Sequence, residues 1–369
     1  MNPVLSLEKY GQSVWLDNIN RSLIKSGELK NLIKEIGLKG VTSNPSIFQK
    51  AVSSGKDYDP QVKSLLAKNP EMTPAELFEE LAVKDIQDAT DILSGVYKKT
   101  NGIDGYVSIE VSPELAYDTN ATIEEARRLN KKAGRPNVMI KIPATQEGIP
   151  AIKKMISEGV NINVTLIFSP KVYEQVVDAY LSGLEERLAA GKKIDTIASV
   201  ASFFISRIDS MVDKELDKVE NKDLKGKIAV ANAKLVYRKG KELFTSERFK
   251  KLQKKGAKIQ RLLWASTSTK NPAYPDVLYV EELIGKNTIN TLPPATIDAY
   301  KDHGKPADRI ESGLKEAADQ MKKLKDLKID FEEVTKRLTE EGVVLFVNSY
   351  KDLIGAISKK KESTQLETA

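Results

Sequence analysis

Three chargeable side chains of this sequence lie near the ends of short strand-like segments, where together they could act on a carbonyl compound. Lys141 interrupts the apolar run VMIKIPAT. An ammonium group without a partner is expensive to bury, so a lysine here is paired, extends its charge to solvent, or serves chemistry. Asp17 lies near the end of SVWLDN (13–18), and Glu110 lies near the end of YVSIEV (106–111). The three groups form a candidate reactive set.

The chemistry that these groups favour is the formation of a Schiff base. Desolvation disfavours the charged form of a lysine, and a neutral amine attacks a ketone or an aldehyde to give an imine. The protonated imine then accepts electrons while a carbon–carbon bond is cleaved or formed, and Asp17 and Glu110 supply carboxylates for proton transfer. Two nearby carboxylates also favour the ammonium form of Lys141, so burial and charge oppose each other.

The composition excludes several other chemistries. The chain of 369 residues has no cysteine and a single histidine, His303. Disulfides, thiolate nucleophiles and cysteine-ligated metals are therefore excluded, and a histidine-rich metal site is excluded as well. His303 stands in the turn-like YKDHGKP, and we expect it to be a surface residue. We predict no metal site.

The formal net charge of +6 is compatible with binding to nucleic acid or to small anions. Lysines cluster in residues 238–258, but glutamates are interspersed at helical spacing, which favours a solvated helix face. We predict no nucleic-acid partner. No apolar run approaches the ~20 residues that span a bilayer, and the N-terminal segment lacks the pattern of a secretory signal. We therefore expect a cytoplasmic protein without membrane association.

Strand-like and amphipathic helical segments alternate along the chain. The eight strand candidates are 13–18, 40–44, 106–111, 137–143, 162–168, 196–203, 260–266 and 287–293. Strict alternation implies a parallel sheet, and eight units suit a closed (β/α)8 barrel of the TIM type. A doubly wound open sheet is the alternative, but no glycine-rich phosphate loop follows any of these strands.

The α/β chain is predicted to form one domain. We place this barrel domain at residues 1–357, including additional C-terminal helices from about residue 305. Residues 358–369 are expected to form a disordered tail, because chain ends fray unless they are tied down.

Polar residues collect at the C-terminal ends of the predicted strands, which is where parallel barrels form their active sites. They are Asp17, Asn44, Glu110, Lys141, Asn163, Thr165, Ser202 and Ser266. Side chains two positions apart in a strand share a face, so Ser108 and Glu110 point the same way, as do Asn163 and Thr165. Each set can point into the barrel while its apolar neighbours meet the helices.

Six motifs in this order resemble transaldolase, a class I aldolase family with a (β/α)8 barrel. They are WLDNINR (15–21), GVTSNPSIFQKA (40–51), IKIPAT (140–145), GVNINVTLIFS (159–169), ASFFISRIDSMVD (201–213) and LLWASTSTKNPAY (262–274). The chain length and the segment that follows the seventh strand are similar to the longer-chain branch of the family. The resemblance implies that Lys141 forms the Schiff base and that Asp17 is the acid or base. It also implies that Glu110 and Thr165 hold a catalytic water.

Six further residues are assigned to the substrate through the same resemblance: Asn44, Asn163, Ser202, Arg207, Ser266 and Lys270. The two asparagines are placed near substrate hydroxyls, and Ser202 and Arg207 at the sugar phosphate. Arg207 also fits on physical grounds, because a helix N-terminus and a guanidinium both favour phosphate. Shorter transaldolases carry a second arginine behind the seventh strand, where this sequence has Lys270 as the nearest cation.

The resemblance implies a transaldolase of the pentose phosphate pathway that uses no cofactor. It would transfer a dihydroxyacetone unit from sedoheptulose 7-phosphate or fructose 6-phosphate to glyceraldehyde 3-phosphate or erythrose 4-phosphate. Two alternatives stay open. One is a class I fructose-6-phosphate aldolase that releases free dihydroxyacetone, and the other is a non-catalytic basic protein that binds nucleic acid. The sequence leaves both a monomer and a homodimer open.

Overall fold

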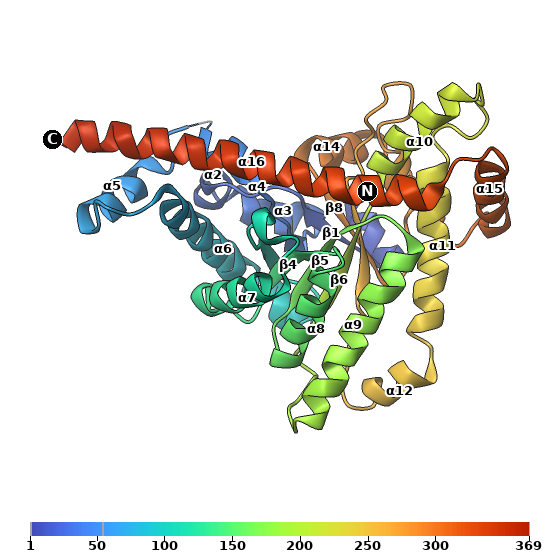
Figure 1. The fold of residues 1–369 in the computed structure, drawn as a ribbon, viewed down its shortest axis with the longest axis horizontal. Coiled ribbons are helices and arrows are strands. Elements are labelled where there is room, and N and C mark those ends of the chain that lie inside the picture. Colours follow the sequence, from blue (N-terminus) through green and yellow to red (C-terminus); the bar gives the residue numbers. More distant parts are fainter. Residues whose placement is uncertain (1, 54, 369) are drawn as a thin grey trace.

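The computed structural model describes residues 2–53 and 55–368, in which eight parallel strands close into a barrel in sequence order (Figure 1). The strands are β1 (Gln12–Leu16), β2 (Gly40–Val41), β3 (Tyr106–Glu110), β4 (Val138–Pro143), β5 (Ile162–Ile167), β6 (Ser199–Phe204), β7 (Arg261–Ala265) and β8 (Thr288–Leu292). β8 pairs with β1 and closes the sheet. The predicted (β/α)8 barrel is confirmed, and the doubly wound open sheet is wrong.

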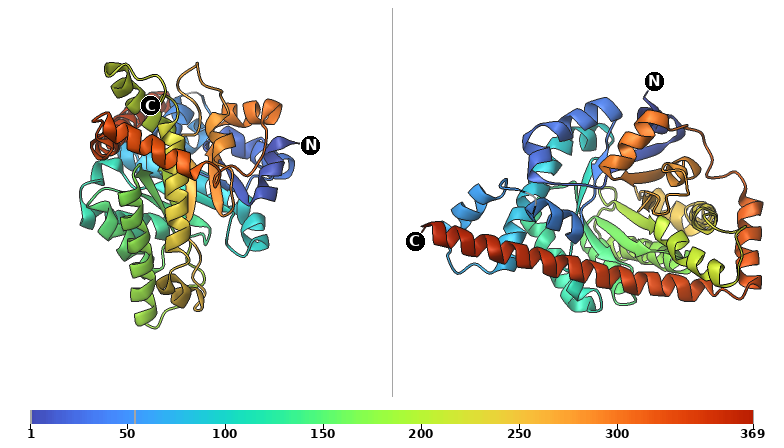
Figure 2. Two further views of the ribbon diagram at one scale, coloured as in Figure 1. Left: turned by 90° about the vertical axis from the view of Figure 1, so that its right-hand side faces the viewer. Right: turned by 90° about the horizontal axis from the view of Figure 1, so that it is seen from above.

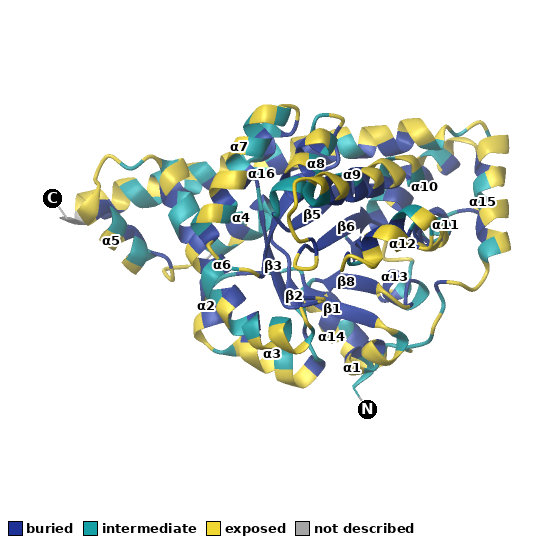
Figure 3. Cartoon of the chain, turned by 90° about the horizontal axis from the view of Figure 1, so that it is seen from below, coloured by how far each residue is buried: buried dark blue, intermediate teal, exposed yellow. Residues whose placement is uncertain are grey.

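The strands are buried on both faces because helices cover the outside of the barrel. Every residue of β4 and β5 is buried. Figure 3 shows the barrel strands as buried and the outward faces of the helices as exposed. Parallel strands covered in this way read as nearly continuous apolar runs, which is why Lys141 stands out in its segment.

Helices follow the strands and surround the barrel (Figures 1 and 2). The α-helices are α1 (Pro3–Ser6), α2 (Arg21–Lys25), α3 (Glu28–Ile36), α4 (Pro45–Ser53), α5 (Asp59–Lys68), α6 (Pro74–Lys99), α7 (Thr119–Ala133), α8 (Gly148–Glu158), α9 (Pro170–Ala189), α10 (Ser206–Lys218), α11 (Ile228–Leu243), α12 (Glu247–Gln253), α13 (Leu278–Glu282), α14 (Pro294–His303), α15 (Leu314–Asp326) and α16 (Phe331–Thr368). Short 3-10 turns lie at η1 (Leu7–Tyr10) and η2 (Pro113–Leu115).

The start of α6 follows from its local sequence. The Thr73 hydroxyl accepts from the backbone N–H of Glu76 at 3.2 Å, and the Glu76 carboxylate accepts from the Thr73 N–H at 2.8 Å. Pro74 occupies the first helical position, where its missing N–H removes a donor that would have no partner in the helix. This capping box fixes the start of the helix that packs on β3.

The C-terminal helices extend further than the sequence analysis expected. Residues 358–368, predicted to be a disordered tail, continue α16 as helix. Side chains tie this end to the body of the molecule: Lys360 pairs with Asp59 of α5, and Lys361 Nζ donates to the carbonyl of Met72 at 2.9 Å. In Figure 2, α16 runs along one side of the barrel and reaches α5 near its end.

Charged side chains on the surface are exposed to solvent and form ion pairs with one another. His303 is exposed and contacts Asp276 at 2.8 Å, which confirms it as a surface residue. Lysines of α11 and α12 pair with glutamates, as Lys250 does with Glu247 at 2.7 Å. Within the part of the chain that the structure describes, no helix is both long enough and apolar enough to cross a membrane.

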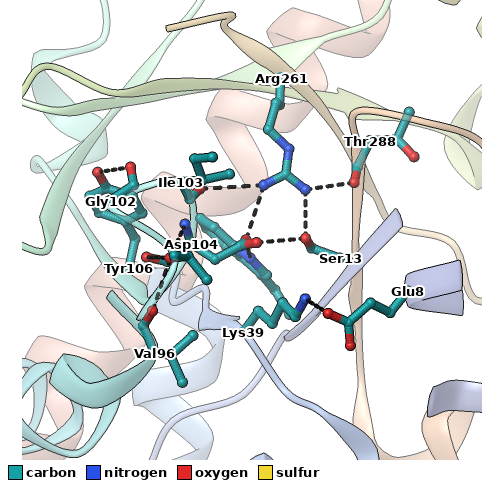
Figure 4. Close-up of polar contacts among 12 residues, drawn as sticks. Glu8, Ser13, Lys39, Val96, Gly102, Ile103, Asp104, Tyr106, Arg261 and Thr288 are labelled. Atoms are coloured by element: carbon teal, nitrogen blue, oxygen red, sulfur yellow. Dashed lines mark hydrogen bonds and ion pairs between the residues drawn. The ribbon is translucent and has the colours of Figure 1, made fainter. Parts of the chain in front are cut away.

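The end of the barrel where the strands begin is closed by a buried charge network (Figure 4). Arg261, the first residue of β7, donates to Asp104 at 3.0 Å, to the hydroxyl of Ser13 at 2.6 Å and to the carbonyl of Thr288 at 2.8 Å. Asp104 also accepts from Ser13 at 2.7 Å and from the Trp15 indole at 3.0 Å. The network joins β1, β7 and β8 to the loop before β3.

We expect Asp104→Ala to destabilise the fold by about 3–5 kcal/mol, because it leaves the buried Arg261 guanidinium without its anion. Urea unfolding measures this loss. Asp91→Ala is the control, because it removes an exposed partner of Arg135 and should cost about 0–1 kcal/mol. Equal losses in the two variants would contradict a structural role for the buried network.

Candidate active site

A cavity of about 320 Å³ lies at the end of the barrel where the strands finish. It brings together most of the residues that the sequence analysis singled out. Those that line it are Asp17, Asn44, Lys141, Thr165, Ser202, Arg207, Ser266 and Lys270. These residues come from six strands or the segments after them, so the closed barrel is what assembles them.

Lys141 is buried inside the barrel and is hydrogen-bonded. Its side chain is 6% exposed, and its Nζ donates to Glu110 Oε2 at 3.1 Å and to the carbonyl of Ser43 at 3.2 Å. Glu110 and Lys141 are register partners on β3 and β4, so strand pairing sets the two side chains at the same level. The ammonium therefore has acceptors, which answers how a lysine can occupy this strand.

Burial and the neighbouring charge of Lys141 act in opposite directions on the pKa of the Glu110 carboxyl group. Burial raises its pKa, and the adjacent Lys141 ammonium only partly offsets that rise. Glu110 borders a second cavity of about 630 Å³, whereas Lys141 borders the first. Asn44 lines both cavities. The ion pair thus forms part of the wall between two spaces.

Asp17 is a second carboxyl group with an altered proton affinity. Burial raises its pKa, and a hydrogen bond from Thr42 together with the charges of Lys141 and Lys270 opposes the rise. The Thr42 hydroxyl donates to Asp17 Oδ1 at 2.7 Å and lies 2.7 Å from the hydroxyl of Thr291. A carboxyl group whose pKa is raised in this way is suited to gain and lose a proton during a reaction.

The two polar residues of β5 have different environments. Thr165 Oγ1 is buried and lines the cavity, and it has no hydrogen-bond partner among the described residues. The amide of Asn163 is fully buried, donating to Ser108 at 3.0 Å and accepting from Ser202 at 2.7 Å. Thr165 is therefore free to bond a small molecule, whereas Asn163 is already engaged and, among the described residues, is not part of the cavity lining.

Cations gather at the rim of the cavity. Arg207 is the second residue of α10, its guanidinium lies 5.9 Å from the Phe204 ring, and burial lowers its pKa. The charge of Glu341 opposes that shift in the pKa of Arg207. Lys270 is exposed, yet protein atoms around its ammonium and the nearby charges of Arg207 and Lys50 lower its pKa. Such a cluster of like charges favours an anion.

Ser266 directly follows β7 and lines the same cavity as Arg207 and Lys270. Its backbone adopts a positive φ of 55°, and its hydroxyl is 2.9 Å from that of Ser206 at the start of α10. The backbone N–H of Ser206 donates to the Ser266 carbonyl at 3.1 Å. These bonds join the segment after β7 to the helix that carries Arg207.

Three contributors were not singled out from the sequence. Thr42 and the carbonyl of Ser43 belong to the GVTSN segment, where only Asn44 was assigned a role. Phe346 comes from α16 and lines the cavity. Position in the predicted strand could have indicated Thr42, but no local pattern links Phe346 to a site more than 200 residues earlier in the chain.

Comparison with known proteins defines the class. The model of the family described as Transaldolase/Fructose-6-phosphate aldolase matches residues 14–357. The chain belongs to this family.

Full-length curated relatives refine that result. The present chain is 48% identical over 372 residues to a protein of Trichodesmium erythraeum named Transaldolase, with 97% of each chain covered. It is also 48% identical to Transaldolase 2 of a Nostoc species and 45% identical to Transaldolase of Saccharopolyspora erythraea, with 98% of each chain covered in both cases. These relatives favour the transaldolase interpretation over that of a free aldolase.

We expect Thr42→Val to raise the pKa of Asp17. The lost hydroxyl stabilised the carboxylate, and a bond worth about 1.5 kcal/mol corresponds to roughly one pKa unit. The limb of the activity–pH profile that follows ionisation of Asp17 should therefore move to higher pH by about that amount. Thr291→Val is the control, because Thr291 contacts Thr42 and should shift the limb less. An unchanged profile in Thr42→Val would show that the ionisation of Asp17 does not affect the reaction.

Proposed function

We propose that this chain acts as a transaldolase through a Schiff base on Lys141. It would transfer a dihydroxyacetone unit from sedoheptulose 7-phosphate or fructose 6-phosphate to glyceraldehyde 3-phosphate or erythrose 4-phosphate. The observation that carries the proposal is a lysine buried at the cavity wall, bonded to Glu110 at 3.1 Å and electrostatically coupled to Asp17. The family match and the names of the relatives support the same reaction class.

The first step of the reaction requires Lys141 in its uncharged amine form. A proton leaves the Lys141 ammonium, and the 3.1 Å bond to Glu110 offers a route for it. The amine attacks the ketone carbon of the donor, and the carbinolamine loses water to give a protonated imine. We assign to Glu110 and Thr165 the handling of that water. The Thr165 hydroxyl can bond it, because this hydroxyl has no hydrogen-bond partner within residues 2–53 and 55–368.

Cleavage then uses the imine as the electron acceptor. A base removes the proton of the donor's C4 hydroxyl, the C3–C4 bond breaks, and its electron pair moves to the imine nitrogen as an enamine forms. We assign Asp17 as this base, because burial raises its pKa and it lines the cavity beside Lys141. The aldose phosphate leaves, the enamine carbon attacks the acceptor aldehyde, and the proton returns to the new hydroxyl. Hydrolysis of the imine releases the product and frees Lys141.

The substrate phosphate is assigned to the cationic rim. Arg207 offers a guanidinium fork at the start of α10, and Ser266 and Lys270 flank it. Asn44 is assigned to a hydroxyl group of the sugar, and Ser202 to the phosphate together with Arg207. Because Asn163 bonds Ser202, its role is to orient that serine.

Borohydride added with fructose 6-phosphate should inactivate the protein and leave a reduced three-carbon adduct on Lys141. Peptide mass spectrometry locates the adduct. Lys141→Met should form no adduct and should lose turnover. Lys234→Met is the matched control, because Lys234 is also buried and is paired with Glu282 at 2.8 Å. That variant should keep the adduct, and an adduct on any lysine other than Lys141 would overturn the proposal.

Arg207→Ala should raise KM for fructose 6-phosphate by about 10–150-fold, the equivalent of losing a charge-assisted hydrogen bond of roughly 1.5–3 kcal/mol. The rate with fructose should change little, because that substrate has no phosphate. Steady-state kinetics on both sugars measure the difference. Arg127→Ala removes an exposed arginine paired with Glu158 and should leave both rates unchanged. Equal losses on the two sugars in Arg207→Ala would indicate a structural role.

A further inference from the structure

The second cavity, of about 630 Å³, borders the ion pair between Lys141 and Glu110. Its walls come from the segments after β2 and β3 and from α4, α6, α7 and α16. Ser43, which is fully buried, and Glu110 line it at the barrel. Ala75 and Glu76 at the start of α6 also line it, and both are exposed. The cavity therefore connects the ends of β2 and β3 with solvent.

Both groups that accept a hydrogen bond from Lys141 belong to this second cavity. Nζ donates to the Ser43 carbonyl at 3.2 Å and to the Glu110 carboxylate at 3.1 Å. In the described part of the chain, the lining of the first cavity includes Lys141 but neither of these acceptors. Asn44 lines both cavities. The nitrogen of Lys141 thus has the first cavity on one side and the polar wall of the second on the other.

The balance of the imine step shows what must move between these spaces. A lysine ammonium and a ketone give a protonated imine and one water, and imine hydrolysis consumes one water. The ketone oxygen leaves as that water, and both of its hydrogens come from the lysine nitrogen. No proton is left over, so the step requires a route for water and none for a proton.

A bound donor obstructs the first cavity as a route for this water. In the proposed function the donor phosphate binds at Arg207 on the rim, so the sugar lies between Lys141 and the solvent on that side. A water needs room and about two to four polar partners. The second cavity offers the Glu110 carboxylate and the Glu125 carboxylate, and the latter also accepts from the Ser112 N–H at 3.3 Å. Water can therefore be held there while the sugar stays bound.

We propose that the second cavity is the path by which the water of imine formation leaves Lys141 and returns to it. This inference rests on the proposed function and deepens it, because it gives the sugar and the water separate routes. Glu110 stands where the two routes meet, and it passes the water from the carbinolamine into the second cavity. The ligand of this cavity is water, and its opening between α6 and α7 exchanges that water with solvent.

The test follows the oxygen of the donor ketone in the full-length protein. Asp17→Asn is the background, because a variant without the assigned base should form the imine and leave the sugar uncleaved. Fructose 6-phosphate that carries heavy oxygen at C2 is added, and mass spectrometry measures the loss of label to solvent, corrected for the loss without protein. Borohydride trapping in parallel measures how much imine forms on Lys141 and how fast.

Ala82→Phe should close the route, because Ala82 is buried and lines the second cavity. A water confined beside Lys141 adds back its own oxygen, so loss of label should fall about tenfold, a barrier to escape higher by roughly 1.4 kcal/mol. The amount of imine and its rate of formation should stay the same. Gly95→Phe is the matched control: it puts the same ring on α6 at an exposed position where a Cβ meets no described atom within 4 Å. Its loss of label should not change.

Unchanged loss of label in a folded Ala82→Phe overturns the inference, and so does an equal fall in loss of label and in the rate of imine formation. Should Ala82→Phe not fold, as judged by circular dichroism, Ala121→Phe decides by the same criteria. Ala121 lines the second cavity from α7 and is only half-buried, so a larger side chain is tolerated there.

Failure of the proposed function gives a different result. An unmodified protein that forms no borohydride adduct on Lys141 means that the proposed function fails. An adduct that is missing only from Asp17→Asn means that Asp17 acts before cleavage. Labelled dihydroxyacetone and the native Asp17 then replace the first pair, because this ketone has no bond to cleave, and Ala82→Phe should lower the loss of label in the same way.

Discussion

A lysine ammonium inside a barrel must keep hydrogen-bond acceptors within reach, because an unpaired buried charge would destabilise the fold. In this protein the acceptors are the Glu110 carboxylate and the Ser43 carbonyl. Both depend on the sheet: Glu110 is the register partner of Lys141, and Ser43 follows β2. The strand pairing that closes the barrel is therefore also what makes the buried amine tolerable, and a slip in register would remove its partner.

The buried charged groups at the two ends of the barrel differ in how fully they are hydrogen-bonded. At the end where the strands begin, Arg261 and Asp104 share a dense set of bonds with Ser13, Trp15 and Thr288. At the other end, burial raises the pKa of both Asp17 and Glu110, and the Thr165 hydroxyl lacks a partner among the described residues. A satisfied network stabilises a fold, whereas carboxyl groups with raised pKa values are suited to proton transfer. The division matches the usual roles of the two faces of such a barrel.

Local pattern was enough to predict the eight strands and the polar residues at their ends, because alternation and parallel topology place those residues in one ring. It was not enough for Phe346, whose relation to Lys141 arises only when α16 packs across the strand ends. The end of α16 was misjudged for the same reason. Lys360 reads as part of a charged tail, but it pairs with Asp59, about 300 residues earlier. Asn163 was placed on the correct strand, but its amide is engaged by Ser108 and Ser202.

The cationic rim and the acid–base group are electrostatically linked. The charge of Lys270 lowers the pKa of Asp17, and Arg207 stands close enough to lower the pKa of Lys270. In the proposed function a substrate phosphate approaches these cations. Its negative charge would cancel part of the field that Lys270 exerts on Asp17, so the carboxylate would become a stronger base once the substrate is bound. Binding at the rim would then prepare the proton transfer deeper in the barrel, and a substrate without phosphate would meet a weaker base.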